Sequence, residues 1–167
     1  MSFKSTILAA LLFAASLCPA MAADIEPKIY FFGASGCDFC ANGLAFLKRF
    51  KAEDNRVLVQ DFDIVGSPDD ATVYVRLVNA IGLSDPRVPM TIIGRHVIIG
   101  YEDDDTTGLE IKLAVEQCRL KACPDLVRGI MTYGPEVALE TPGEWTVDRR
   151  FAKAASHGEV TAGVVAP

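Results

Sequence analysis

The chain has 167 residues, a formal net charge of −6, and half of its residues are hydrophobic. A sequence this apolar and of this length is long enough to fold as one domain with a core of its own. Its acidic balance and its lack of basic runs argue against nucleic acid or anionic lipid as a partner.

Residues 1–22 have the build of a secretory signal peptide. Lys4 supplies a positive start, residues 7–17 are apolar, and Ala20-Met21-Ala22 offers a small-residue cleavage site. The apolar run is too short to anchor the protein in a bilayer. We therefore expect cleavage after Ala22, export to the periplasm or the medium, loss of Cys18 with the signal, and no membrane insertion of the mature chain.

Residues 23–124 show the alternating patterns of an α/β domain. The apolar runs at 28–33 and 56–64 predict strands, and helical periodicity predicts a helix from Asp38 to about Glu53. Asp69 and Asp70 are expected to cap a second helix that runs to about Ile81 and ends at Gly82.

The rest of this domain reads as a hairpin followed by a helix. Residues 91–93 and 97–99 predict two short strands joined through Gly94-Arg95-His96. The acids of residues 102–105 open a last helix, which Arg119 and Lys121 close. The predicted order is β-α-β-α-β-β-α. Residues 125–167 read as a C-terminal extension, with a further turn or short helix up to residue 140 and a partly disordered tail beyond it.

Four cysteines remain after loss of the signal, and the first two form a C-x-x-C pair between a strand and a helix. Cys37 would sit at the start of the helix, where free N–H groups and the helix dipole favour a thiolate. Cys40, one turn later, would point inward and resolve a mixed disulfide on Cys37. This context indicates a redox-active disulfide; a structural disulfide and a metal site are the alternatives.

Cys118 and Cys123 form the second pair, five residues apart at a predicted helix end. In a continuous helix they would lie beyond bridging distance, so they can pair only if the chain turns at residues 120–122. We expect a structural disulfide that holds the extension in place. A second redox pair that exchanges with the first, or free thiols, are the alternatives.

Across residues 27–124 the sequence resembles the thioredoxin-fold superfamily. The resemblance is carried by the strand, C-x-x-C and helix unit, by Val88-Pro89 before a strand, and by the hairpin with its final helix. More narrowly, it is similar to small exported glutaredoxin-like proteins, through the motifs VPMTIIG, VIIGYEDDD and CRLKACPD.

This resemblance implies a three-layer α/β fold with a mixed sheet and a thiol-disulfide oxidoreductase that needs no cofactor or metal. It also implies a cis Pro89 against the cysteines and a Val88 backbone that docks substrate peptides as an added strand. The implied partners are protein thiols and disulfides, with a DsbD-type membrane carrier as electron donor, and we expect a monomer. Phe39, on the rim of the active turn, is a further candidate for substrate contact.

The sequence departs from the family pattern at three places. Phe31 stands where thioredoxins carry a buried acid, and Ser35-Gly36 replaces the tryptophan before the first cysteine. Tyr101 replaces the second glycine of the pair that holds glutathione in glutaredoxins, which leaves glutathione use open.

Asp38, between the cysteines, bears on the direction of electron flow. Its carboxylate opposes the helix dipole and should raise the pKa of Cys37, which favours a reductant or an isomerase over an oxidase. The alternative is that Asp38 faces solvent and only caps the helix. Two other functions remain open: a non-catalytic binding module with this fold, and a periplasmic metallochaperone.

Overall fold

The computed structural model describes residues 26–121, 123–137 and 144–148. Its elements are, in chain order, β1 (Lys28–Gly33), α2 (Asp38–Glu53), β2 (Leu58–Asp63), α3 (Pro68–Ala80), β3 (Met90–Ile93), β4 (His96–Ile99), the π-helical turn η1 (Asp104–Gly108), α4 (Leu109–Leu120), α5 (Leu126–Tyr133) and β5 (Thr146–Asp148). The predicted order β-α-β-α-β-β-α is confirmed up to α4. The expected signal peptide lies outside the described residues.

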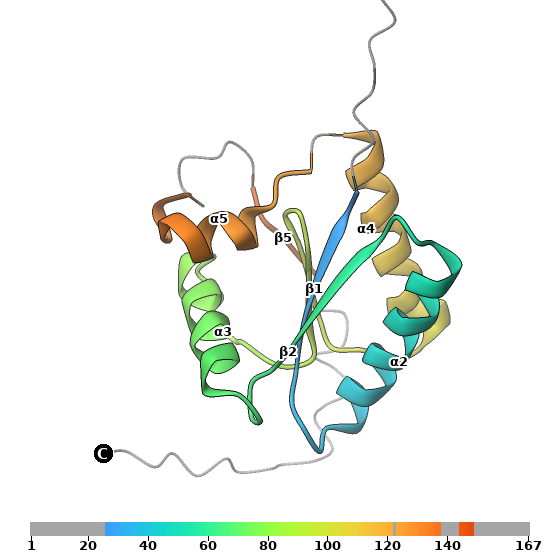
Figure 1. Ribbon diagram of the computed structural model, residues 1–167, viewed down its shortest axis with the longest axis horizontal. Coiled ribbons are helices and arrows are strands. Elements are labelled where there is room, and N and C mark those ends of the chain that lie inside the picture. The colour runs from blue at the N-terminus through green and yellow to red at the C-terminus, as the bar shows by residue number, and fades with distance from the viewer. Residues whose placement is uncertain (1–25, 122, 138–143, 149–167) are drawn as a thin grey trace, which may run out of the picture.

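The strands form one mixed sheet in the order β2-β1-β3-β4-β5. β1 runs parallel to β2 and antiparallel to β3, while β4 runs antiparallel to β3 and parallel to β5. Helices α2 and α4 cover one face of this sheet, and α3 and α5 cover the other (Figure 1). The predicted fold class is confirmed: this is a three-layer α/β fold of the thioredoxin-like kind.

The central strand β1 divides the core into two halves. Ile29 and Phe31 pack with α2 and α4, whereas Tyr30 and Phe32 pack with α3 and α5, because successive side chains of a strand point to opposite faces. All four side chains are at most 4% exposed. This burial on both faces fixes β1, and with it the point at which the chain leaves the sheet toward the first cysteine pair.

Three local details differ from the sequence-based expectations. The cap of α3 is Ser67, whose hydroxyl accepts a hydrogen bond from the Asp70 N–H, so Asp69 and Asp70 lie in the first turn instead. The hairpin turn is shorter than expected, since His96 already pairs with Ile93 in the sheet. The last helix begins with a wide π turn, which Asp103 caps.

The C-terminal extension contains a short helix in the segment where its sequence allowed one, and a strand that its sequence did not predict. Helix α5 packs through Val127 and Ile130 on the same side of the sheet as α3. Strand β5 pairs with β4, although the tail from residue 141 was expected to lack such structure. A strand of three residues carries too little periodicity to be seen in a sequence, and its partner lies about fifty residues earlier in the chain.

Candidate active site

Cys37 and Cys40 are joined by a disulfide in the turn between β1 and α2, with their Cα atoms 5.2 Å apart. Cys37 is the N-cap residue of α2, and its Sγ accepts a hydrogen bond from the Cys40 N–H at 3.1 Å. Cys37 is half-buried, whereas Cys40 is 4% exposed. The two sulfurs therefore differ: one lies where a reagent can reach it, and the other lies in the core.

Two glycines shape the turn in different ways. Gly36 has φ +84°, and a methyl group added there would meet nothing within 4 Å, so the space beside Cys37 is open. Gly33 is closely packed, because a methyl group there would lie 3.3 Å from the Cβ of Cys40. Gly33 thus serves the close packing of β1 against α2.

Val88 and Pro89 lie beside the cysteine pair. The register that pairs Phe32 with Met90 places Pro89 next to Gly33, the residue against which Cys40 packs. The Val88-Pro89 peptide bond is cis, as the resemblance implied, and Val88 is half-buried against both halves of the core. The site residues Cys37, Cys40, Val88 and Pro89 are therefore brought together at one end of the sheet.

Asp38 and Phe39 form the outer side of the first turn of α2. Both are exposed, and Phe39 is 64% exposed despite its large apolar ring. Because the Cys37 sulfur itself accepts the capping hydrogen bond, Asp38 is not the cap that the sequence allowed it to be. A substrate contact by Phe39 and an effect of Asp38 on Cys37 remain predictions.

No carboxyl group lies buried beneath the cysteines in the described part of the chain, where Thr91 and Thr107 are the buried polar residues. Phe31 is buried at this place instead, with 2% of its side chain exposed. Its ring packs closely against Gly43 of α2. Tyr101 is also buried, and its hydroxyl donates a hydrogen bond to Asp104 at 2.5 Å. Burial and this carboxylate raise the pKa of Tyr101 above its usual value.

Asp63, at the end of β2, is a site residue that the sequence did not reveal. Its Oδ1 accepts hydrogen bonds from the backbone N–H groups of Ser35 at 3.0 Å, Val65 at 3.1 Å and Gly66 at 3.0 Å. Its Oδ2 accepts a hydrogen bond from the Ser35 hydroxyl. These bonds, led by the one from the Ser35 hydroxyl, lower the pKa of Asp63 to about 2.

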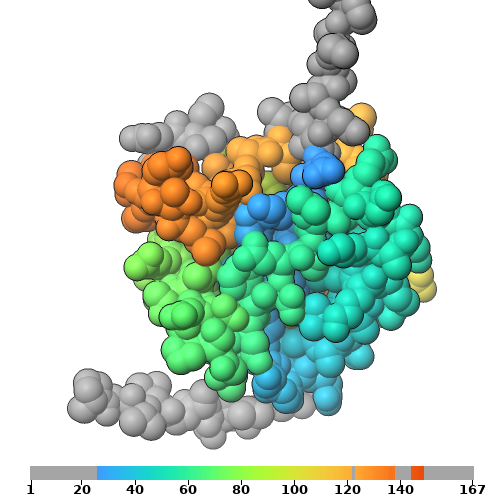
Figure 2. Space-filling view, in the orientation of Figure 1, coloured from blue at the N-terminus to red at the C-terminus, as the bar shows by residue number. Residues whose placement is uncertain are grey.

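Asp63 therefore connects the loop after β2 to the turn that presents Cys37. Figure 2 shows these two segments side by side on the surface, in blue and green at the lower edge of the molecule. The sequence signal was faint, since an aspartate that ends a strand is common. Its partner Ser35 lies 28 residues earlier, so no local pattern links the two residues.

The second disulfide joins Cys118 and Cys123, whose Cα atoms are 4.7 Å apart. Helix α4 ends at Leu120 and Lys121 is extended, which provides the turn that this pairing requires. The bridge packs on the hairpin turn, because a methyl group added to Gly94 would lie 2.9 Å from the Cys123 sulfur and 3.2 Å from the Cys118 sulfur.

The two disulfides lie at opposite ends of β1. Cys40 packs against Gly33, the last residue of that strand, while Gly94 is opposite its first residue, Lys28. Five strand steps of ~3.3 Å separate these ends by roughly 16 Å. This separation argues against direct exchange between the two pairs within one molecule.

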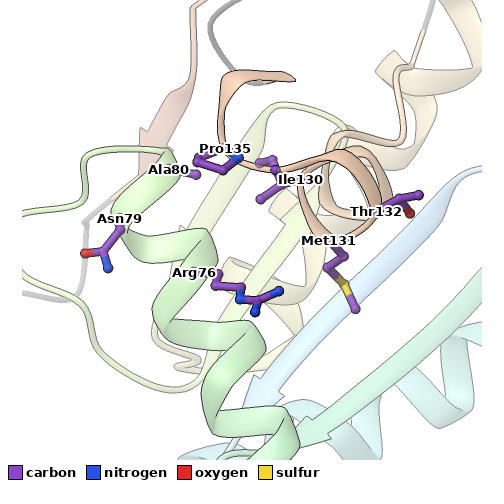
Figure 3. A pocket seen from close by; sticks show the side chains of 8 residues that line it. Arg76, Asn79, Ala80, Ile130, Met131, Thr132 and Pro135 are labelled. Atoms are coloured by element: carbon purple, nitrogen blue, oxygen red, sulfur yellow. The ribbon is translucent and has the colours of Figure 1, made fainter.

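A shallow hollow lies between α3 and α5, away from both disulfides. Arg76 and Asn79 of α3 and Met131 and Thr132 of α5 are among the residues that line it (Figure 3). These residues of α3 lie at the end of the helix opposite to Asp63. Within the described ranges, no group of three or more His, Cys, Asp and Glu could hold a metal ion, and no helix is long and apolar enough to cross a membrane.

No family model matches the chain, and no curated protein matches it. Among solved structures, the chain is similar to the crystal structure of a glutaredoxin from Archaeoglobus fulgidus, with 22% identity over 50% of this chain and 86% of that chain and a TM-score of 0.37. The thioredoxin-like fold of this chain accordingly rests on its own element order and mixed sheet, with the C-x-x-C disulfide at the start of α2.

Proposed function

We propose that the chain is an exported thiol-disulfide oxidoreductase that acts on disulfides of protein substrates through Cys37 and Cys40. The observation that carries this proposal is the inequality of the two sulfurs. Cys37 caps a helix and is half-buried beside open space at Gly36, whereas Cys40 is buried within bridging distance of it. A dithiol that exchanges disulfides needs one sulfur that attacks and one that resolves.

The reaction begins with the reduced pair. The Cys37 thiolate attacks one sulfur of a substrate disulfide, which forms a mixed disulfide and releases the other substrate sulfur as a thiolate that takes up a proton. The Cys40 sulfur loses its proton and attacks the Cys37 sulfur, which releases the second substrate thiol. Two electrons pass to the substrate, and the Cys37–Cys40 disulfide is left oxidised.

Helix α2 supplies the electrostatic part of this proposal. The Cys37 sulfur caps the start of this helix and accepts a hydrogen bond from the Cys40 N–H. A thiolate at this place would keep that hydrogen bond and gain from the helix dipole. The side chain that attacks would therefore be ionised more readily than a cysteine in solution.

We propose the reducing direction, with a DsbD-type membrane carrier as donor of the two electrons. Asp38 supports this direction, because an exposed carboxylate in the first turn makes a thiolate at Cys37 less stable. A less stable reduced form makes a dithiol the better electron donor. Export is proposed from the N-terminal sequence pattern, and the working protein is proposed to be a monomer.

Substrate binding is proposed at the rim of this site. The Val88 backbone would pair with an extended substrate segment, and Phe39, which is 64% exposed, would contact its apolar side chains. Both residues lie beside the Cys37 turn, as the register of β1 and the start of α2 require.

Single cysteine variants test the assigned roles. In Cys40→Ser the mixed disulfide between Cys37 and a peptide disulfide should accumulate, because the resolving sulfur is gone. In Cys37→Ser the same adduct on Cys40 should form at least about 100 times more slowly, since a buried thiol is poorly accessible. Mass spectrometry of the non-reduced protein measures both rates.

The matched control is the double variant Cys118→Ser with Cys123→Ser, which removes the other disulfide and should exchange at the wild-type rate. Equal trapping by the Cys37→Ser and Cys40→Ser variants would show that the two sulfurs are not divided into an attacking and a resolving one. If neither the Cys37→Ser nor the Cys40→Ser variant formed an adduct, the proposed activity would be refuted.

A further inference from the structure

The turn before Cys37 is held by a side chain from another strand. Ser35 donates two hydrogen bonds to the Asp63 carboxylate, one from its backbone N–H at 3.0 Å and one from its hydroxyl. Ser35 is exposed, and Gly36, which follows it, has open space around it. Packing therefore does little to fix residues 35 and 36. They are restrained by the carboxylate of Asp63 and by the turn hydrogen bond from the Cys37 N–H to the Ala34 carbonyl at 3.2 Å.

Asp63 is itself held rigidly enough to act as an anchor. Its backbone N–H donates to the Asp70 carboxylate at 2.9 Å, and its carbonyl accepts from the Ser67 N–H at 2.9 Å. Its Oδ1 also accepts from the N–H groups of Val65 and Gly66. Asp63 thus belongs to the well-bonded junction between β2 and α3, and Ser35 is tied to that junction.

We propose that Asp63 is a positioning residue for Cys37: through Ser35 it holds the turn in which the Cys37 sulfur caps α2. This inference rests on the proposed function, in which Cys37 is the attacking sulfur. Loss of the tether would let residues 35 and 36 move, and the sulfur would leave the capping position for part of the time. A thiolate that loses the N–H groups of the helix start is less stable, so the pKa of Cys37 would rise.

Three variants separate the tether from other effects of Asp63. Asp63→Ala removes every bond to the carboxylate. Asp63→Asn removes the charge but keeps an oxygen that can accept from the three N–H groups and an amide that can donate to the Ser35 hydroxyl. Ser35→Ala removes only the bond from the hydroxyl. Asp61→Ala is the matched control, because Asp61 is an exposed carboxylate on the same strand, two residues earlier.

The measurement is the rate of iodoacetamide alkylation at Cys37 of the reduced protein between pH 4 and pH 10, followed by peptide mass spectrometry. The pKa of Asp63, about 2, keeps its carboxylate ionised throughout this range. Asp63→Ala should raise the midpoint by at least about half a pH unit, which is about threefold less thiolate at a pH below the midpoint. Ser35→Ala should shift it in the same direction by less, and Asp61→Ala should not shift it.

Asp63→Asn should restore a midpoint at or below that of the wild type, because it keeps the tether and removes a negative charge. A midpoint as high in Asp63→Asn as in Asp63→Ala would overturn the tether. So would an unchanged midpoint in both Asp63→Ala and Ser35→Ala, even with a lower melting temperature, since Asp63 would then only stabilise its own loop. The titration needs no substrate, so failure of disulfide exchange in the wild type would refute the proposed function alone.

Discussion

At the scale of single residues, the chemistry depends on what surrounds each sulfur atom. Cys37 lies at the start of a helix with one N–H directed at it, and Cys40 lies in the core cluster that also contains Phe31 and Tyr101. The described residues place no buried carboxyl group beneath the pair. In the proposed reaction, proton transfer to and from Cys40 would therefore use water or substrate groups that reach the turn.

Asp38 is the residue whose replacement tests the proposed direction. Asp38→Asn should lower the pKa of Cys37, because it removes a negative charge from the first turn of α2, and it should make the pair a weaker reductant. The pH dependence of Cys37 alkylation measures the first effect and a thiol-disulfide equilibrium measures the second. Asp69→Asn, which removes an exposed acid from the first turn of α3, is the control. An unchanged Cys37 titration would remove the electrostatic reason for a reductase.

The cysteine pair could be predicted because its pattern is local in the sequence. The contact between Asp63 and Ser35 could not, because it joins residues that are far apart in the chain. Cys37 and Cys40 are three residues apart at a change from strand to helical periodicity, so their context is readable locally. The bond between Asp63 and Ser35 exists only once β2 pairs with β1. Ser67 was missed as the cap of α3 because the acids after it gave a stronger pattern.

At the scale of elements, β1 links the redox site to the second disulfide. Its last residue packs on Cys40, and its first residue lies opposite the turn on which Cys118 and Cys123 rest. Lys28 and Tyr30 of the same strand bond to Asp125 at 3.1 Å and 2.6 Å, which attaches the start of α5. The second disulfide and these hydrogen bonds therefore hold the C-terminal extension at one end of the strand, while the proposed site of disulfide exchange lies at the other.

Gly94→Ala tests the packing of the second disulfide on the hairpin. Gly94 has φ +55°, and an added methyl group would lie 2.9 Å from the Cys123 sulfur. The free energy of unfolding should fall by about 1–2 kcal/mol because of the backbone strain, and further because of the close contact with the sulfur. Gly82→Ala is the matched control, because Gly82 has φ +67° but open space around it.

Denaturant unfolding measures the free energy of unfolding of each glycine variant. Gly94→Ala should cost more than Gly82→Ala, and the excess should disappear when Cys118 and Cys123 are both replaced by alanine. Cys37 should exchange disulfides at the wild-type rate in every one of these variants. Equal costs in the presence of the disulfide would mean that the bridge does not rest on this turn.

The bounds of elements with a strong hydrophobic pattern were predicted closely. Elements with a weak pattern were missed. The bounds of β1 and α2 agree with expectation, since one is a dense apolar run and the other a long amphipathic pattern. The π turn at the start of the last helix was missed, because the sequence signal of acids before a helix is the same for either geometry. Strand β5 was missed because its pairing with β4 is a long-range property.

At the scale of the whole molecule, the fold separates the proposed site of disulfide exchange from the disulfide that we expect to be structural. The two ends of β1, on which the disulfides rest, lie roughly 16 Å apart, and the core between them is apolar on both faces of the sheet. The fold class was predictable because the order of strands and helices restricts the ways in which one sheet can be built. Export is proposed from the N-terminal sequence pattern, and the electron donor is proposed from the resemblance of the sequence to exported glutaredoxin-like proteins.

The most direct test of the central claim is a redox titration of the protein in thiol-disulfide buffers, with each cysteine followed by alkylation and mass spectrometry. The Cys37–Cys40 pair should open reversibly between about −120 and −270 mV, toward the more negative end, as a reductase requires. The Cys118–Cys123 disulfide should stay closed over this range, as expected for a structural bridge. If the first pair does not open, or if both pairs open together, the division into a redox-active and a structural disulfide is wrong.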